Sequence, residues 1–176
     1  MKANPLIIKT LGQPTIDWLI AKGVSPKAMI KTWSGQSSLI MTAQGERGSD
    51  GRFDPHPEGK NWFVFEEGND KVFWEPKSGE IATLEGRSFA LGEEMIDNPA
   101  TTAFDQYLNI WADPLQWLQH ERGGIVVLNW SFAFDRLRDV ARIAVTQPML
   151  TTYQRNMKPP HMPKLAVLPV TERLSA

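Results

Sequence analysis

The sequence predicts an α+β fold in which a small antiparallel meander precedes a βαβαβ unit with parallel strands. Two observations lead to this fold class. Between residues 61 and 92, short aromatic and β-branched runs alternate with turns rich in Gly and Asp, which is typical of a meander. Between residues 107 and 147, apolar runs alternate with amphipathic runs, which indicates strand, helix, strand, helix, strand.

The elements expected in the later half are a strand at 107–111, a helix after Asp113, a strand at 125–128, a helix at 132–140 and a strand at 143–145. Asp113 and Pro114 are the usual N-cap and first-turn pair of a helix. Gly123 and Gly124 are expected to end that helix, because glycine takes the left-handed conformation freely. The β-branched run at 125–128 favours a strand that is buried on both faces.

The earlier half contains weaker signals. The expected elements are an edge strand at 6–8, helices after Thr15 and Ser25, a strand at 39–41, and meander strands at 62–65, 72–74 and 81–84, with 87–91 completing the sheet. Residues 44–60 are rich in Gly, Pro and charge, so we expect them to form a long exposed loop. Residues 93–106 are expected to be an irregular connector.

The chain length favours a single globular domain over residues 1–176. Its expected segments are an N-terminal arm and helix pair (1–34), a flexible loop region (35–60), an antiparallel sheet and connector (61–106), the βαβαβ unit with a helix (107–157) and a Pro-rich extended tail (158–176). An apolar run at 165–168 within the tail suggests one more edge strand.

Composition excludes several function classes. The chain has no cysteine, which rules out disulfides, thiolate nucleophiles and cysteine-ligated metal sites. The net charge of -1 argues against a non-specific nucleic-acid binder. Residues 61–110, however, hold ten acidic and three basic residues, a local balance of -7. No window suggests a signal peptide or a membrane span, so we expect a cytoplasmic protein without a membrane partner.

The sequence contains none of the common catalytic signatures. There is no Gly-x-Ser-x-Gly elbow, no phosphate-binding Gly-x-x-x-x-Gly-Lys and no Gly-x-Gly-x-x-Gly after a strand. His56, His120 and His161 lie far apart, and His120 is expected to cap a helix end. We therefore expect no catalytic set, no cofactor and no metal. The alternative is a nucleotide- or metal-dependent enzyme with a scattered site, for which Asp54, His56 and Glu58 are the candidates.

Candidate binding residues follow from the expected parallel sheet, because open parallel sheets bind ligands beyond the carboxyl ends of their strands. The residues expected there are Trp111, Asp113, Asn129, Trp130, Ser131 and Gln147. The two tryptophans could stack on a base or on an apolar side chain of a partner. The alternative is that both complete the core and that Asp113 is a helix cap.

Three arginines in the second amphipathic run form a candidate nucleic-acid patch: Arg136, Arg138 and Arg142. Asp135 and Asp139 interleave with them at helical spacing. Pairing within the helix is the alternative to phosphate binding.

Two features resemble bacterial-type DNA primases. Residues 17–26, Asp17-Trp-Leu-Ile-Ala-Lys-Gly-Val-Ser-Pro26, resemble the helix pair before the catalytic core of such primases. The order of a small sheet at 62–91 and a βαβαβ run at 107–147 is similar to a toprim domain. Residues 86–92, 113–118 and 124–128 resemble proteins without assigned activity from phage and plasmid elements of alphaproteobacteria.

The resemblance implies a magnesium site that this sequence lacks. A toprim enzyme needs a glutamate after the first strand and an Asp-x-Asp after a later one to hold magnesium. Trp111-Ala112 and Asn129-Trp130-Ser131 stand at those positions. We therefore expect a non-catalytic interaction or accessory protein of a mobile genetic element, with a role in its replication as the narrower expectation. An accessory that binds single-stranded nucleic acid is the alternative. Partner identity and oligomeric state do not follow from the sequence.

Overall fold

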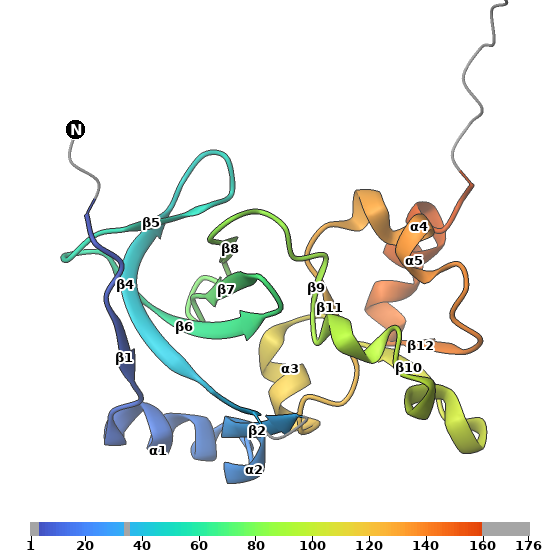
Figure 1. Cartoon of the computed structure of the whole chain (residues 1–176), viewed down its shortest axis with the longest axis horizontal. Coiled ribbons are helices and arrows are strands. Elements are labelled where there is room, and N and C mark those ends of the chain that lie inside the picture. Colours follow the sequence, from blue (N-terminus) through green and yellow to red (C-terminus); the bar gives the residue numbers. More distant parts are fainter. Residues whose placement is uncertain (1–3, 34–35, 160–176) are drawn as a thin grey trace, which may run out of the picture.

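Antiparallel strands dominate the first half of the chain, and a small parallel sheet forms in the second half (Figure 1). The computed structural model describes residues 4–33 and 36–159. The mixed α+β class expected from the sequence is therefore confirmed, with a mostly antiparallel main sheet. The predicted tail strand at 165–168 and His161 lie outside the described residues.

The main sheet contains β1 (Ile8–Thr10), β4 (Met41–Arg47), β5 (Phe53–Pro55), β6 (Lys60–Glu67), β7 (Asp70–Trp74) and β8 (Ile81–Thr83). The predicted meander is confirmed as β6, β7 and β8, which pair antiparallel in chain order. β1 is the predicted edge strand, shifted to Ile8–Thr10, and it pairs with β4. A separate hairpin joins β2 (Ile30–Trp33) to β3 (Gln36–Leu39).

Residues 44–60 do not form the long exposed loop that the sequence predicted. They complete β4, form β5 and begin β6. β1 and β5 pair with successive parts of one edge of β4, and a bridge from Arg52 to Thr83 brings the far end of the sheet back to β5. The sheet thus curls on itself, which Figure 1 shows as a curved wall around β7 and β8.

An aromatic core inside the curl explains why this polar segment is ordered. The rings of Phe53 and Phe73 stack at 3.8 Å, and the Trp62 indole N–H donates to the carbonyl of Gly45 at 2.9 Å. A Cβ at Gly45 would lie 2.4 Å from the Phe53 ring. These contacts bury apolar surface within the segment and, together with the strand pairing of β4 with β5 and β6, offset the ordering entropy of its polar residues.

Replacing Phe53 with leucine should lower the free energy of unfolding by about 1.5 kcal/mol, because the stacked contact with Phe73 is lost and the volume is only partly refilled. Urea unfolding measures the change. Phe132→Leu is the matched control, because Phe132 is exposed, and it should change the stability by less than about 0.5 kcal/mol. Equal, small effects of both substitutions would show that the segment around Phe53 does not belong to the core.

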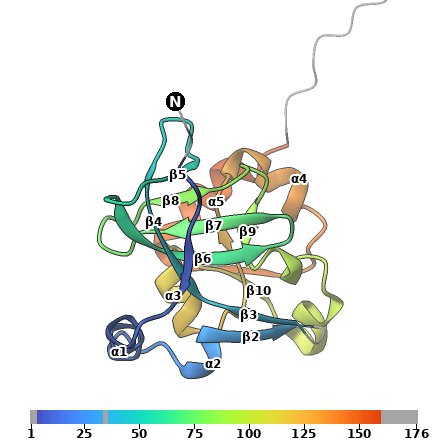
Figure 2. The same ribbon diagram turned by 60° about the vertical axis from the view of Figure 1, so that its left-hand side comes forward.

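Helices cover the outer face of the curled sheet (Figure 2). These are α1 (Gln13–Ala21), α2 (Pro26–Met29) and α3 (Pro114–Gln119). The helix expected after Thr15 begins earlier, at Gln13, with Gly12 as its N-cap. Ser25 caps α2, as the sequence predicted, by accepting a hydrogen bond from the Ala28 amide. Trp117 of α3 meets Phe65 of β6 edge-on at 5.7 Å, so the later half is packed directly onto the sheet.

The second half contains β9 (Ala90–Leu91), β10 (Leu108–Ile110), β11 (Val126–Val127) and β12 (Ile143–Val145), with α4 (Ala133–Leu137) and α5 (Leu150–Asn156). Short 3-10 helices are η1 (Glu93–Met95), η2 (Pro99–Asp105), η3 (Trp130–Phe132) and η4 (Gln147–Met149). The predicted order of elements in the βαβαβ run is confirmed, although the elements are shorter than expected. No helix among the described residues is long and apolar enough to cross a bilayer.

Parallel pairing in this half is confirmed in part. β10 pairs parallel with β12, and Ile110 forms a parallel bridge with Ile125. β11, however, pairs antiparallel with β9. The prediction that residues 87–91 complete the meander is therefore wrong. A buried β-branched run needs hydrogen-bond partners on both sides, and β9 supplies the second one.

The end of α3 also differs from the prediction. The helix ends at Gln119 rather than at the glycine pair, and Glu121 and Arg122 take left-handed backbone conformations with φ of 55° and 58°. Position 124 requires a glycine because of close packing, not because it ends the helix. A Cβ there would lie 2.3 Å from the Asn109 carbonyl oxygen. Arg122 is turned inward by this bend.

Candidate functional site

The residues predicted at the ends of β10 and β11 mostly serve the fold. The Trp111 indole N–H donates to the Gly123 carbonyl at 2.7 Å, and its ring stacks on His120 at 3.9 Å. Asp113 caps α3 by accepting a hydrogen bond from the Gln116 amide. His120 is the C-cap residue of α3, and its Nδ1 lies 2.8 Å from the Gln116 carbonyl oxygen.

The second predicted group opens η3. The Asn129 side-chain oxygen accepts hydrogen bonds from the amide and the hydroxyl of Ser131. Trp130 is half-buried against the core of the second half. Gln147 is exposed at the start of η4, beyond the end of β12. These residues surround the parallel strands, but the polar contacts of Asp113, Asn129 and Ser131 are local caps.

The three predicted arginines are paired with acids. Arg136 lies 2.5 Å from Glu93 and Arg142 lies 2.7 Å from Asp105, whereas the contact of Arg138 with its neighbour Asp139 is exposed and 3.6 Å long. The acids that pair with Arg136 and Arg142 belong to the connector, not to the same helix. This pairing reduces the positive charge that the arginines could offer to phosphates.

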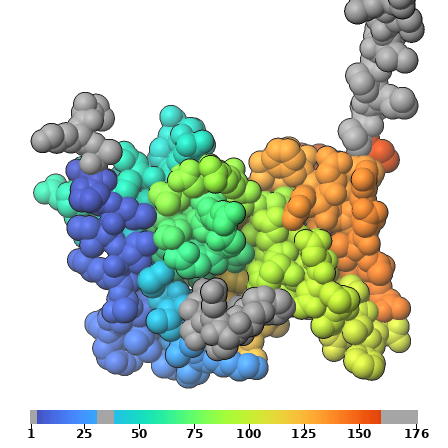
Figure 3. Space-filling model, viewed as in Figure 1, coloured from blue at the N-terminus to red at the C-terminus, as the bar shows by residue number. Residues whose placement is uncertain are grey.

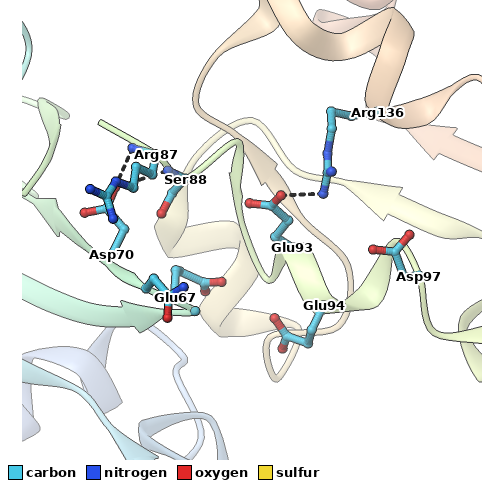
Figure 4. Close-up of a pocket in the computed structure, with 10 residues that line it drawn as sticks. Glu67, Asp70, Arg87, Ser88, Glu93, Glu94, Asp97 and Arg136 are labelled. Atoms are coloured by element: carbon cyan, nitrogen blue, oxygen red, sulfur yellow. Dashed lines mark hydrogen bonds and ion pairs between the residues drawn. The ribbon is translucent and has the colours of Figure 1, made fainter. Parts of the chain in front are cut away.

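A pocket of about 390 Å³ lies where the β6–β7 turn, η1 and α4 meet (Figure 4). Its charged lining residues are Glu67, Asp70, Arg87, Glu93, Glu94, Asp97 and Arg136. Five carboxylates against two guanidinium groups make its surface negative on balance. A smaller neighbouring pocket shares Arg87, Glu93 and Arg136 and extends the hollow to Asn129 and the exposed Phe132.

Asp70 builds one wall of this pocket. Its side chain is only 4% exposed, and it accepts hydrogen bonds from the amides of Lys71, Glu85, Arg87 and Ser88. Burial alone would raise the pKa of Asp70, but the four N–H donors outweigh it, so the pKa lies below its ordinary value. The carboxylate therefore anchors residues 85–88 to the β6–β7 turn.

Glu67 and Glu93 link this wall to η1 and α4. Glu67 accepts a hydrogen bond from the Gly92 amide at 2.8 Å. Glu93 accepts one from the Phe89 amide and also holds Arg136. Within the described ranges, no group of three or more acidic or histidine side chains is placed to hold a metal ion. The carboxylates of this pocket thus organise its shape.

Arg122 is a buried cation behind the pocket. It is 3% exposed, and its guanidinium lies over the rings of Phe65 and Trp117 at 5.9 and 5.6 Å. Burial lowers the pKa of Arg122 to about 10, while the charges of Glu67 and Glu94 act to raise it. Arg122 therefore joins the sheet, α3 and the acidic pocket electrostatically.

Residues 93–107, which we call the acidic arm, begin at the pocket, where Met95 and Ile96 pack on the core of the second half, and continue into a tip that projects from the body of the protein (Figures 1 and 3). Phe104 lies within it and is 97% exposed. Phe104 and Asp105 both have left-handed backbone conformations, with φ of 51° and 64°. Arg142 holds this bend through Asp105 and through the Thr102 carbonyl oxygen at 3.3 Å.

Sequence reasoning missed both the pocket and the arm. The sequence pattern gave no role to Glu67 and predicted only an irregular connector at 93–106. The available signal was the charge distribution, since residues 93–107 contain four acidic and no basic residues.

Comparison of the chain with protein-family models, with curated proteins and with solved structures found no match.

Proposed function

We propose that this chain is a non-catalytic interaction protein that docks onto a partner protein through its acidic arm. The observation that carries the proposal is the almost complete exposure of Phe104 on a strained, clamped backbone. The proposed setting is accessory work for a mobile genetic element, including its replication. That setting is supported by the sequence resemblance alone.

The strain at Phe104 has a cost that the fold itself does not repay. A left-handed conformation costs a residue with a side chain about 1 kcal/mol relative to glycine. Such conformations persist where the surroundings hold them, and they cluster at ligand clamps and switch regions. Arg142 provides the hold, and the Phe104 ring gains no burial in return. The arrangement therefore suits a ring that is buried by a partner.

Docking would bury the Phe104 ring and gain the hydrophobic free energy that is absent while the ring is exposed. Full burial of a phenylalanine side chain is worth about 2 kcal/mol, and aromatic anchors dominate many interfaces. Tyr107, which is 54% exposed, ends the arm and adds a second aromatic contact. Asp97 is exposed on the arm, and the side chain of Asp105 stays 90% exposed although it is paired with Arg142, so the arm favours a partner whose apolar pocket has a basic rim.

A toprim-like arrangement of β10, β11 and β12 is the finer part of the proposal. The parallel pairing of β10 with β12 supports it. By the sequence resemblance, Trp111 and Ala112 stand where a toprim enzyme has its first metal ligand, and the Trp111 indole N–H donates a hydrogen bond to the Gly123 carbonyl. That contact supports a structural role at this position in place of metal binding.

Replacing Phe104 with glycine should raise the free energy of unfolding by about 1 kcal/mol, because glycine tolerates a φ of 51°. The same change should abolish partner binding. The measurements are urea unfolding and capture from a lysate of the source cells on immobilised full-length chain. Phe132→Ala is the matched control, since Phe132 is also an exposed phenylalanine.

The expected outcome is a set of proteins retained by the unsubstituted chain and by Phe132→Ala and lost with Phe104→Gly. An identical set on all three resins would contradict docking through the arm. Tight, stoichiometric binding of Mg²⁺ in calorimetry would contradict the non-catalytic part of the proposal.

A further inference from the structure

A second hollow, of about 360 Å³, lies on the outer face of the main sheet, far along the chain from the acidic arm. It is formed by the residues leading into and along β1, by β4, by the start of β6 and by the loop between β5 and β6, whose strands Figure 2 shows from this side. The lining residues that carry the argument are Ile7, Lys9, Gln44, His56, Pro57 and Asn61. Its volume is within the range of about 300–1,000 Å³ that is usual for small-molecule sites.

The hollow exists because the helices cover only part of this face. Thr42 and Phe63 are direct partners in the β4–β6 pair, and Phe63 is buried under α1, where Trp18 stacks on it. Two residues further along, the next pair on the same face is Gln44 and Asn61, and both are exposed. The sheet face therefore continues past the helical cover and presents polar side chains there.

The polar groups that line this hollow include one cation, Lys9, and several side chains that can donate hydrogen bonds. In the part of the chain that the structure describes, no carboxylate residue lines it, whereas Lys9 does. His56 Nδ1 accepts a hydrogen bond from the Glu58 amide, which places the proton of the neutral ring on Nε2 as a donor. Among residues 4–33 and 36–159, the Lys9 ammonium and the Gln44 and Asn61 amide groups make no hydrogen bond or ion pair.

We propose that this hollow binds a small organic anion, a carboxylate or phosphate group carried on a compact apolar body. Lys9 and His56 Nε2 bind the oxyanion, and the side-chain amides of Gln44 and Asn61 add hydrogen bonds. Ile7 and Pro57 contact the apolar body. The positive sign of this lining is opposite to that of the pocket in Figure 4, so the two hollows select different ligands.

The test uses phenyl phosphate and phenylacetate as anionic probes and benzyl alcohol as the uncharged counterpart, titrated into the full chain by calorimetry. We expect 1:1 binding of at least one anionic probe with a Kd below about 1 mM and no saturable binding of benzyl alcohol. Preference for one probe identifies the oxyanion as phosphate or carboxylate. Inorganic phosphate should bind more weakly than phenyl phosphate, because it lacks the apolar body.

Substitutions locate the site. Lys9→Gln should weaken binding about tenfold through the loss of a charge-assisted hydrogen bond, and Lys9→Arg should restore most of it. Lys77→Gln is the control, because Lys77 is exposed in the turn after β7 and lies outside the hollow. Absence of saturable binding of both anions, binding of benzyl alcohol with equal strength, or equal effects of Lys9→Gln and Lys77→Gln would each overturn the proposal.

Discussion

Replacing Asp70 with asparagine should lower the free energy of unfolding by about 3 kcal/mol at neutral pH. The buried carboxylate accepts four backbone hydrogen bonds, three of them from residues 85–88. An asparagine keeps one acceptor oxygen and turns an NH₂ group toward N–H donors, so part of the set is left unsatisfied. Urea unfolding measures the loss, with Asp139→Asn as the control at an exposed position.

This effect has a defined pH dependence. The pKa of Asp70 is lower in the folded protein than in the unfolded chain, so ionised Asp70 favours folding. Its contribution is complete above the unfolded value of about 4 and is lost as the pH falls through the folded value. The stability difference between the unsubstituted chain and Asp70→Asn should therefore be constant from pH 7 to pH 5 and shrink below pH 4. A difference that stays constant into acid would show that the hydrogen bonds do not depend on the charge.

Replacing Arg122 with alanine should lower the free energy of unfolding by about 4 kcal/mol. The guanidinium packs on Phe65 and Trp117, and one of its nitrogens donates to the Met29 carbonyl at 3.4 Å. Alanine leaves a cavity at the contact between the sheet and α3. It also removes the positive charge that faces Glu67 and Glu94.

Two further variants separate these causes. Arg122→Met refills most of the volume without the charge, so its stability should lie between those of the alanine variant and the unsubstituted chain. Arg138→Ala, at an exposed arginine, should cost less than about 0.5 kcal/mol. If methionine destabilised the protein as much as alanine does, loss of the positive charge near Glu67 would account for the whole loss of stability. Stability equal to that of the unsubstituted chain would show that packing alone matters.

Asp70 and Arg122 act on the same part of the molecule. Asp70 fixes the wall of the acidic pocket that comes from the sheet, and Arg122 ties the sheet to α3 behind it. Glu93 then connects η1 to α4 through Arg136. The shape of the pocket therefore depends on contacts between the halves.

The local elements of this protein were largely predictable because their causes lie within a few residues. Asp113 caps α3 and Ser25 caps α2 through the next turn of backbone, and the alternation around Trp62 indicates a strand. The order of strands and helices from 107 to 147 followed from the same short-range patterns. Their ends were less predictable, as α3 shows, because Arg122 bends inward for a tertiary contact.

The functional surfaces were not predictable in this way. The arginine patch proposed from helical spacing is paired with acids about 40 residues away, Arg136 with Glu93 and Arg142 with Asp105. Residues 44–60, which were expected to be a loop, belong to the sheet, and the ring of Phe53 stacks there on Phe73. In each of these pairs the two residues lie far apart in the sequence, so no periodic pattern around either residue indicates the contact.

The sequence by itself therefore determined the type and order of the elements, the absence of cysteine chemistry and the acidic character of residues 93–107. Only the tertiary structure decided that β9 pairs with β11, that the sheet curls around Phe53, and that Phe104 is held out in solvent. The physical reason is the separation in sequence between the residues that interact. Hydrogen bonds and hydrophobic periodicity within one element are encoded locally, whereas these contacts depend on which distant surfaces bury most apolar area once the chain has closed its loops.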